Sequence, residues 1–272
     1  MPARKGRHKM RKYYTIYKAT LIDRLQYTLN LLFGLITFFI LLFVFMNLWN
    51  YIYSDTSNLI NGYSKEQMIW YIIVAEIIWF GTRNRTLTSQ ISDDIKNGGI
   101  AYGINKPYHY IAYIVAKHLG EISIQFIMFT GAGLLLGTLF VGSVPSLKLY
   151  QLPLVLLSLL LGIFVNTFLR MAISILSFWI EDCLPFHWIY DKLLIVVGTL
   201  FPVEMFPLWA QPIIRATPIF VVTYGPSKLV IDYSLSMALQ VISSQLIYLV
   251  VSFGLLLLLY RKGVKKLYVN GG

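Results

Sequence analysis

Two charged side chains lie inside runs of apolar residues, where a charge needs an explanation. Glu76 stands between Ala75 and Ile77 in an apolar run, and Arg170 interrupts another. A carboxylate inside a membrane should face protein or a water-filled cavity. Glu76 is therefore a candidate to contact a substrate or to pair with a base such as Arg170, and a purely structural polar contact explains it equally well. Arg170 can alternatively extend its head group to the inner membrane surface.

Most other chemistries are excluded by what the sequence lacks. Its four histidines are far apart and its one cysteine is Cys183, so neither a metal cluster nor an internal disulfide is expected. A Walker A nucleotide-binding loop needs a glycine followed by lysine, and no glycine in this chain is followed by lysine. No pair of catalytic residues occurs at a motif spacing. We therefore expect no bound cofactor and no enzymatic activity on this chain.

The composition indicates an integral membrane protein. Of 272 residues, 57% are hydrophobic and only 13% are charged, whereas soluble domains carry about 45–50% apolar and about 25% charged residues. There is too little polar surface to cover a soluble globule of this size. We expect an all-α fold with a six-span transmembrane domain over residues 29–260, preceded by a cytoplasmic segment 1–28 and followed by a cytoplasmic tail 261–272.

Six segments are candidates to cross the membrane as helices of roughly 20 residues. The fifth is unusual, because only 11 uncharged residues separate Lys192 from Glu204. It must begin near Phe186, which takes Asp191 and Lys192 into the inner headgroup zone. The six expected spans are residues 29–49, 66–82, 122–147, 150–180, 186–203 and 233–260.

The segment after the fifth span cannot be one continuous helix. Pro202, Pro207 and Pro212 interrupt it within 11 residues, yet it stays apolar until Arg215. Non-helical backbone at membrane depth is tolerated where it is buried in protein or lines a cavity. We interpret residues 201–230 as short re-entrant helices in the outer leaflet. An ordinary extracellular loop is the alternative.

The basic residues predict the orientation. With both termini in the cytoplasm, 18 of the 23 Lys and Arg residues lie on the inner side and four on the outer side, with Arg170 inside a span. This agrees with the positive-inside rule. The net charge of +11 is therefore explained by topology and by affinity for anionic lipid rather than by nucleic-acid binding.

Periodicity predicts one helix at the membrane surface. Tyr13, Tyr17, Leu21 and Leu25 recur every four residues, which gives residues 11–26 an apolar face. Such a helix suits the inner interface before the first span.

Three further polar or small-residue features are better explained by packing than by ligand binding. Gln125 and Asn166 are expected to form hydrogen bonds between helices. Gly133 and Gly137 form a G-x-x-x-G pattern, which permits close contact between two helices.

The largest cytoplasmic loop, residues 83–117, is expected to carry a short amphipathic helix. Ile91 and Ile95 lie one turn apart, with Asp93, Asp94 and Lys96 on other faces. Gly98 and Gly99 would end this helix, and Lys106-Pro107 favours an extended step before the next one. Such an element can insert Ile91 and Ile95 into the groove of a soluble partner.

The chain resembles the six-span permease subunits of type-2 ABC exporters over about residues 11–266. Two motifs carry the resemblance. The loop motif is matched by Asp94, Lys96, Gly98 and Lys106-Pro107, with Asp94 where a glutamate is usual and a second acid, Asp93, before it. The outer motif is matched by Gly198, Pro202, Pro207, Trp209 and Pro218.

The resemblance implies a function. The loop would be a coupling helix that contacts a separate ABC ATPase, with ATP and Mg bound by that partner, and Ile91, Asp93, Ile95 and Gly99 would belong to the same surface. Asp191 and Lys192 are interpreted as solvated charges rather than as a second contact. Glu76, Arg170 and Glu204 would join the outer-motif residues along the pathway or at its outer gate.

The expected protein is therefore an exporter permease in a bacterial-type plasma membrane, paired with a second permease and moving an amphiphilic cargo such as a peptide, an antibiotic or a lipid-like molecule. Two alternatives stay open. One is an ion-coupled secondary transporter in which Glu76 carries protons, and the other is an integral-membrane enzyme.

Overall fold

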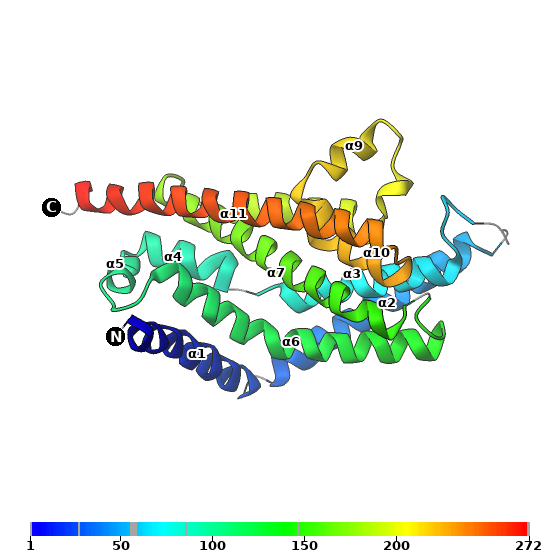
Figure 1. Ribbon diagram of the computed structural model, residues 1–272, viewed down its shortest axis with the longest axis horizontal. Coiled ribbons are helices and arrows are strands. Elements are labelled where there is room, and N and C mark those ends of the chain that lie inside the picture. Colours follow the sequence, from blue (N-terminus) through cyan, green and yellow to red (C-terminus); the bar gives the residue numbers. More distant parts are fainter. Residues whose placement is uncertain (1, 27, 55–58, 85, 146, 271–272) are drawn as a thin grey trace.

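The computed structural model is a bundle of α-helices, and it describes residues 2–26, 28–54, 59–84, 86–145 and 147–270 (Figure 1). No β-strand occurs among these residues. The helices are α1 (Pro2–Gln26), α2 (Thr28–Ile52), α3 (Lys65–Thr82), α4 (Ile91–Lys96), α5 (Gly99–Ile104), α6 (Tyr110–Phe140), α7 (Leu152–Ile175), α8 (Leu184–Leu194), α9 (Ala210–Arg215), α10 (Gly225–Ile231) and α11 (Leu235–Asn270). The expected all-α fold is confirmed for the described part of the chain.

Four helical segments within the described residues are long and apolar enough to cross a membrane. They are Leu31–Ile52, Tyr110–Phe140, Leu149–Phe178 and Leu235–Leu267, and they correspond to the expected first, third, fourth and sixth spans. The other two expected spans fall on α3 and on α8, which continues as the π-helical turn Ile195–Leu200.

The bounds expected for the third span are wrong. It begins at Tyr110 instead of near Ile122 and ends at Phe140 instead of Leu147. Lys117 was expected in the loop 83–117, but its side chain and that of Glu121 are bonded within the chain. Buried Tyr110, Ile111 and Ile114 extend the apolar contact surface toward the helix start, so the helix continues beyond the uncharged run and shortens the expected loop 83–117.

Helix α3 is enclosed on every side. Every residue from Met68 to Trp79 is buried, as is typical of a helix that is apolar all round and lies in a core. Its start is fixed by a capping box, in which the Ser64 hydroxyl accepts from the Gln67 N–H and the Gln67 side chain accepts from the Ser64 N–H. The main hydrophobic cluster surrounds this helix.

The predicted close helix contact at the G-x-x-x-G pattern is confirmed between α6 and α3. A Cβ atom on Gly133 would lie 2.6 Å from Ile77, and one on Gly137 would overlap the ring of Trp70. At Gly131, two residues before Gly133 and on another face of α6, a Cβ atom would meet nothing within 4 Å. In this glycine-rich stretch, a side chain is therefore excluded at the two glycines that face α3.

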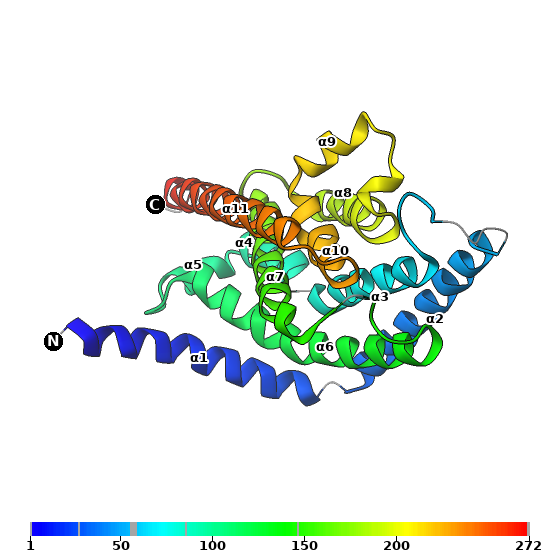
Figure 2. The same cartoon turned by 45° about the vertical axis from the view of Figure 1, so that its right-hand side comes forward.

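Helix α1 lies along the outside of the bundle beside α6 (Figure 2). The two backbones come close at Gly120, where a Cβ atom would lie 2.6 Å from the carbonyl oxygen of Tyr17. The Tyr17 hydroxyl bonds to Ser123 at 3.1 Å. Tyr13, Tyr17 and Leu21 are half-buried, as their period predicts, whereas Leu25 is exposed.

The two ends of the bundle differ in what they carry. The start of α1, the end of α11 and the short helices α4 and α5 gather at one end, which we call the inner end (Figure 1). The end of α2 and the start of α11 lie at the opposite, outer end (Figure 1). The expected short helices of 201–230 are found, as α9, α10 and a π-helical turn Phe220–Tyr224.

Candidate functional site

Residues 86–108 lie at the inner end of the bundle, and we call them the paired-helix module. A π-helical turn, Thr86–Gln90, runs directly into α4. Gly98 adopts a left-handed conformation with φ of 71°, which a residue with a side chain rarely adopts. The N–H of Asn97 donates to the carbonyl of Asp93 at 2.9 Å. The predicted helix and its glycine-dependent end are confirmed, and α5 follows immediately.

The apolar side of this module packs inside the chain. Ile91 and Ile100 are fully buried and Ile95 is 7% exposed. They belong to an inner core formed with α7 and α11, whose members include Met171, Ile175, Phe178 and Leu256. The expectation that Ile91 and Ile95 insert into a partner is therefore wrong, because other helices of the same chain already cover them.

The two acidic residues of the module have different surroundings. Asp94 is half-buried and accepts a hydrogen bond from the Tyr110 hydroxyl at 3.2 Å. Asp93 is exposed. Of the two, Asp93 is the one whose side chain is available to a partner.

The outward surface of the module is polar, with one large aromatic side chain. Tyr102 is 79% exposed and was not singled out from the sequence, although an aromatic residue between Gly99 and Gly103 was a usable signal. The other exposed residues of this surface are Asp93, Lys96, Asn97, Gly98, Ala101, Asn105, Lys106 and Pro107. Of the expected coupling residues, Gly99 is only partly exposed.

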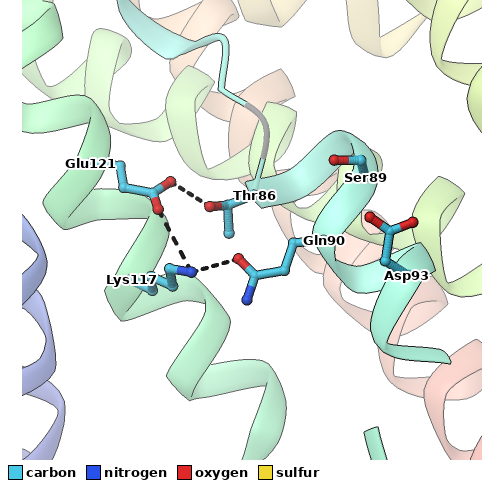
Figure 3. Close-up of a pocket in the computed structure, with 6 residues that line it drawn as sticks. All are labelled: Thr86, Ser89, Gln90, Asp93, Lys117 and Glu121. Atoms are coloured by element: carbon cyan, nitrogen blue, oxygen red, sulfur yellow. Dashed lines mark hydrogen bonds and ion pairs between the residues drawn. The ribbon is translucent and has the colours of Figure 1, made fainter. Parts of the chain in front are cut away.

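A polar cavity of about 360 Å³ lies between the module and α6, and Figure 3 shows the side chains that line it. Glu121 accepts hydrogen bonds from Thr86 at 2.5 Å and from Asn84 at 2.7 Å. Lys117 donates to Gln90 at 2.5 Å and lies 3.9 Å from Glu121. The remaining lining residues are Ser89 and Asp93. These bonds tie the π-helical turn to α6.

Arg170 is the centre of a buried polar network between α3, α7 and α8. It is 2% exposed and forms an ion pair with Asp191 at 2.7 Å. Its Nε donates to Asn166 at 3.1 Å, and Asn166 also accepts from the Tyr190 hydroxyl at 3.0 Å. The guanidinium carbon lies 5.9 Å from the centre of the Trp79 ring.

This network corrects three expectations and confirms one. Arg170 pairs with Asp191 and not with Glu76, and its head group is buried among helices of the chain instead of extending away from it. Asp191 is not a solvated charge, although Lys192 is exposed. The interhelical roles of the two amides are confirmed, because Asn166 donates to Thr82 at 3.3 Å and Gln125 donates to the carbonyl of Arg83 at 3.0 Å.

Glu76 is buried among apolar side chains. It is 4% exposed, and its Oε2 atom has no hydrogen-bond partner among the described residues. A carboxylate oxygen left unpaired in a core costs free energy. The alternative that Glu76 makes a purely structural polar contact is therefore not supported, because no described residue bonds to its Oε2 atom.

Glu204 organises the segment that follows the fifth expected span. Its carboxylate accepts hydrogen bonds from Tyr63 at 2.7 Å, from Arg215 at 3.1 Å and from Tyr224. Burial raises the pKa of Glu204, but the hydrogen bonds from Tyr224 and Tyr63 oppose it, and together with further favourable contacts they hold the pKa below its ordinary value of 4.5. Glu204 therefore fixes residues 203–215 to the bundle as an ionised carboxylate.

The other residues of the outer motif do not converge on Glu204. The carbonyl of Gly198 accepts from the buried Tyr71 hydroxyl at 2.7 Å, and Pro202 is buried. Pro207 and Trp209 are exposed, with Trp209 at 74%, and Pro218 is partly exposed. The motif thus combines buried contacts to α3 with an exposed aromatic surface.

Together, four apolar helices and a rigid, polar-faced module at one end define a multi-pass membrane protein. The family model for the ABC-2 family transporter protein matches residues 35–271. The chain belongs to this family, and it is a permease of an ABC transporter that works with an ATPase subunit. The resemblance drawn from the two motifs is confirmed. A search of the curated proteins finds no match.

The buried ion pair predicts an asymmetric response to mutation. Asp191→Leu alone should destabilise the protein by about 3–5 kcal/mol, because it leaves the Arg170 charge buried and unpaired. Arg170→Met combined with Asp191→Leu should cost much less, since the double change leaves no unpaired charge. Unfolding of the purified protein in detergent measures both effects.

The matched control is Glu181→Leu, which removes an exposed acid near the same inner turn and should change stability by less than about 0.5 kcal/mol. Equal losses in the single and double variants would contradict a dominant role for the ion pair.

Glu204 predicts a pH dependence. Because its folded pKa is lowered, its stabilisation is present above the ordinary glutamate pKa of 4.5 and is lost as the pH falls through the folded value. The wild-type unfolding temperature should therefore fall more steeply in acid than that of Glu204→Gln. Thermal unfolding across that pH range checks this, with Glu181→Gln as a control that keeps the wild-type slope. Parallel curves for wild type and Glu204→Gln would refute it.

Proposed function

We propose that this chain is one of two permease subunits of an ATP-driven exporter in a bacterial-type plasma membrane. It crosses the membrane six times with both termini in the cytoplasm. The 18 inner against four outer basic residues support this orientation. The start of α1 and the end of α11 also lie at the same end of the bundle as the paired-helix module (Figure 1). Helix α3 has 18 residues and spans about 27 Å, close to the hydrocarbon thickness of about 30 Å.

One observation carries the coupling proposal. The paired-helix module is held to the bundle by buried isoleucines on one side and presents exposed polar groups and Tyr102 on the other. We assign this exposed surface, with Asp93, Lys96 and Lys106, as the docking site for the ATPase. The partner supplies the nucleotide site and binds ATP and Mg.

The contacts of the module determine how force would reach the pathway. Its isoleucines pack on α7 and α11, while Glu121 and Lys117 bond its first turn to α6. A displacement of the module on ATPase closure would therefore move three helices together. The Arg170 network lies beside this contact and connects α7 to α3 and α8.

The outer segment is assigned to the exit side of the pathway. Residues 201–230 are proposed to re-enter the outer leaflet, with Gly198, Pro202, Glu204, Pro207, Trp209 and Pro218 at the outer gate. The exposed Trp209 and Leu208 support contact with an apolar environment. An amphiphilic cargo agrees with a chain that is 15% aromatic, and the second permease, identical or a sister chain, encloses the other half of the pathway.

The docking surface is tested through Tyr102. Burying this side chain against a partner contributes about 1.5–3 kcal/mol at full burial, whereas each exposed charge pair adds about 0–1 kcal/mol. Tyr102→Asp should therefore lower co-purification of the partner ATPase at least about tenfold, and should reduce transport. Asp93→Lys should have a smaller effect, mainly on the rate of association.

Tyr51 offers a matched control. It is also 79% exposed but lies near the end of α2, at the outer end of the bundle. Tyr51→Asp should leave ATPase binding unchanged. Retention of the ATPase by a correctly folded Tyr102→Asp variant would exclude this surface. Ile91→Asp is not a clean test, because Ile91 is fully buried in the chain.

Glu76 is proposed to face the pathway, since its Oε2 atom has no partner among the described residues. Glu76→Gln should leave the expression level and the unfolding temperature near the wild-type values, because the amide fills the same volume and carries no charge. It should alter the transport rate in vesicles that contain the ATPase. Unchanged transport at normal expression would remove Glu76 from the pathway.

A further inference from the structure

An apolar groove opens beside α1 toward the inner end of the bundle. Its volume is about 380 Å³, and α6, α7 and α11 supply most of its lining. The main lining side chains are Ile111, Val115, Leu119, Phe168, Phe253 and Leu257. No charged side chain lines this groove among the described residues. The groove suits a hydrocarbon chain and offers little to a polar ligand.

A second cavity adjoins the groove and has a different character. Its volume is about 370 Å³, and Lys12, Tyr13, Pro107, Tyr108 and His109 line it. Tyr13 and His109 line both cavities, so the two are direct neighbours. The second cavity forms a polar mouth to the apolar groove.

The mouth is built by contacts between α1 and the turn before α6. The Nζ atom of Lys12 donates to the Pro107 carbonyl at 3.2 Å, and the His109 N–H donates to the Tyr13 hydroxyl at 3.0 Å. Lys106 lies 5.9 Å from the centre of the Tyr108 ring. The charged group that lines the mouth is thus a cation, and none of its described lining residues is acidic.

We propose that this pair of cavities binds an anionic phospholipid of the inner leaflet, with an acyl chain in the groove and the phosphate at Lys12. The charge at the mouth favours an anionic over a zwitterionic headgroup. The position at the inner end places the groove where lipid of the cytoplasmic leaflet surrounds the chain, so this ligand is present at high concentration. A bound lipid would fill the space between α1 and the bundle and hold α1 against α6.

The site is tested by thermal unfolding of delipidated protein in detergent. Dioleoyl phosphatidylglycerol should raise the unfolding temperature more than dioleoyl phosphatidylcholine. Lys12→Gln should raise the half-maximal phosphatidylglycerol concentration about fivefold, the factor expected for one lysine at an anionic surface. Ala112→Trp, which fills the groove that Ala112 lines, should abolish the shift from both lipids.

Matched variants and ligands make the test specific. Lys18→Gln and Ala19→Trp alter exposed residues of α1 that do not line either cavity and should respond like wild type. Dihexanoyl phosphatidylglycerol and inorganic phosphate should give little shift, because neither carries a chain that fills the groove. Equal stabilisation by the two dioleoyl lipids would overturn the proposal, as would an unchanged response in Lys12→Gln. An equal shift from phosphate alone would overturn the acyl-chain assignment.

Discussion

The inner end of the molecule depends on the contact between the paired-helix module and helices α7 and α11. The module buries Ile91, Ile95 and Ile100 in this contact. Helices of six residues do not form stably by themselves, so α4 and α5 exist because their apolar sides are covered. Full burial of each isoleucine contributes roughly 1.5–3 kcal/mol. The same contact leaves only the polar side and Tyr102 for a partner. A surface that is rigid before binding loses less entropy when it docks.

Glutamine side chains inside the bundle donate hydrogen bonds to backbone carbonyls of neighbouring helices. Gln125 donates to the carbonyl of Arg83, just beyond the end of α3, and Gln245 donates to the carbonyls of Ser158 and Val221. Carbonyls at helix ends lack intrahelical partners, and no water is available to them inside a membrane. These glutamines allow the π-helical turn at Val221 and the end of α3 to lie among packed helices.

Local patterns were sufficient to predict local structure. The spacing of Ile91 and Ile95, followed by Gly98, predicted the position of α4. The long uncharged runs predicted that the four apolar helices exist, although the run at 122–147 placed the start of α6 too late. The sequence could not predict which residues cover Ile91. Its partners in the inner core, such as Met171 and Leu256, lie about 80 and 165 positions away in the chain. The same limit applies to Arg170, whose partner Asp191 resembled any other charge at a turn. The charge of Lys117 suggested a loop, since charge alone does not reveal that a helix continues.

Helix α3 connects the inner and outer networks of the molecule. Near its end, Trp79 lies against Arg170 and Thr82 accepts from Asn166. In its first half Tyr71 donates to Gly198, and just before its first turn Tyr63 donates to Glu204. Because α3 is buried on all sides in close packing, it cannot shift without disturbing contacts at both ends. In the proposed exporter, this helix is the physical link through which a displacement of the module and a rearrangement of residues 201–219 depend on each other.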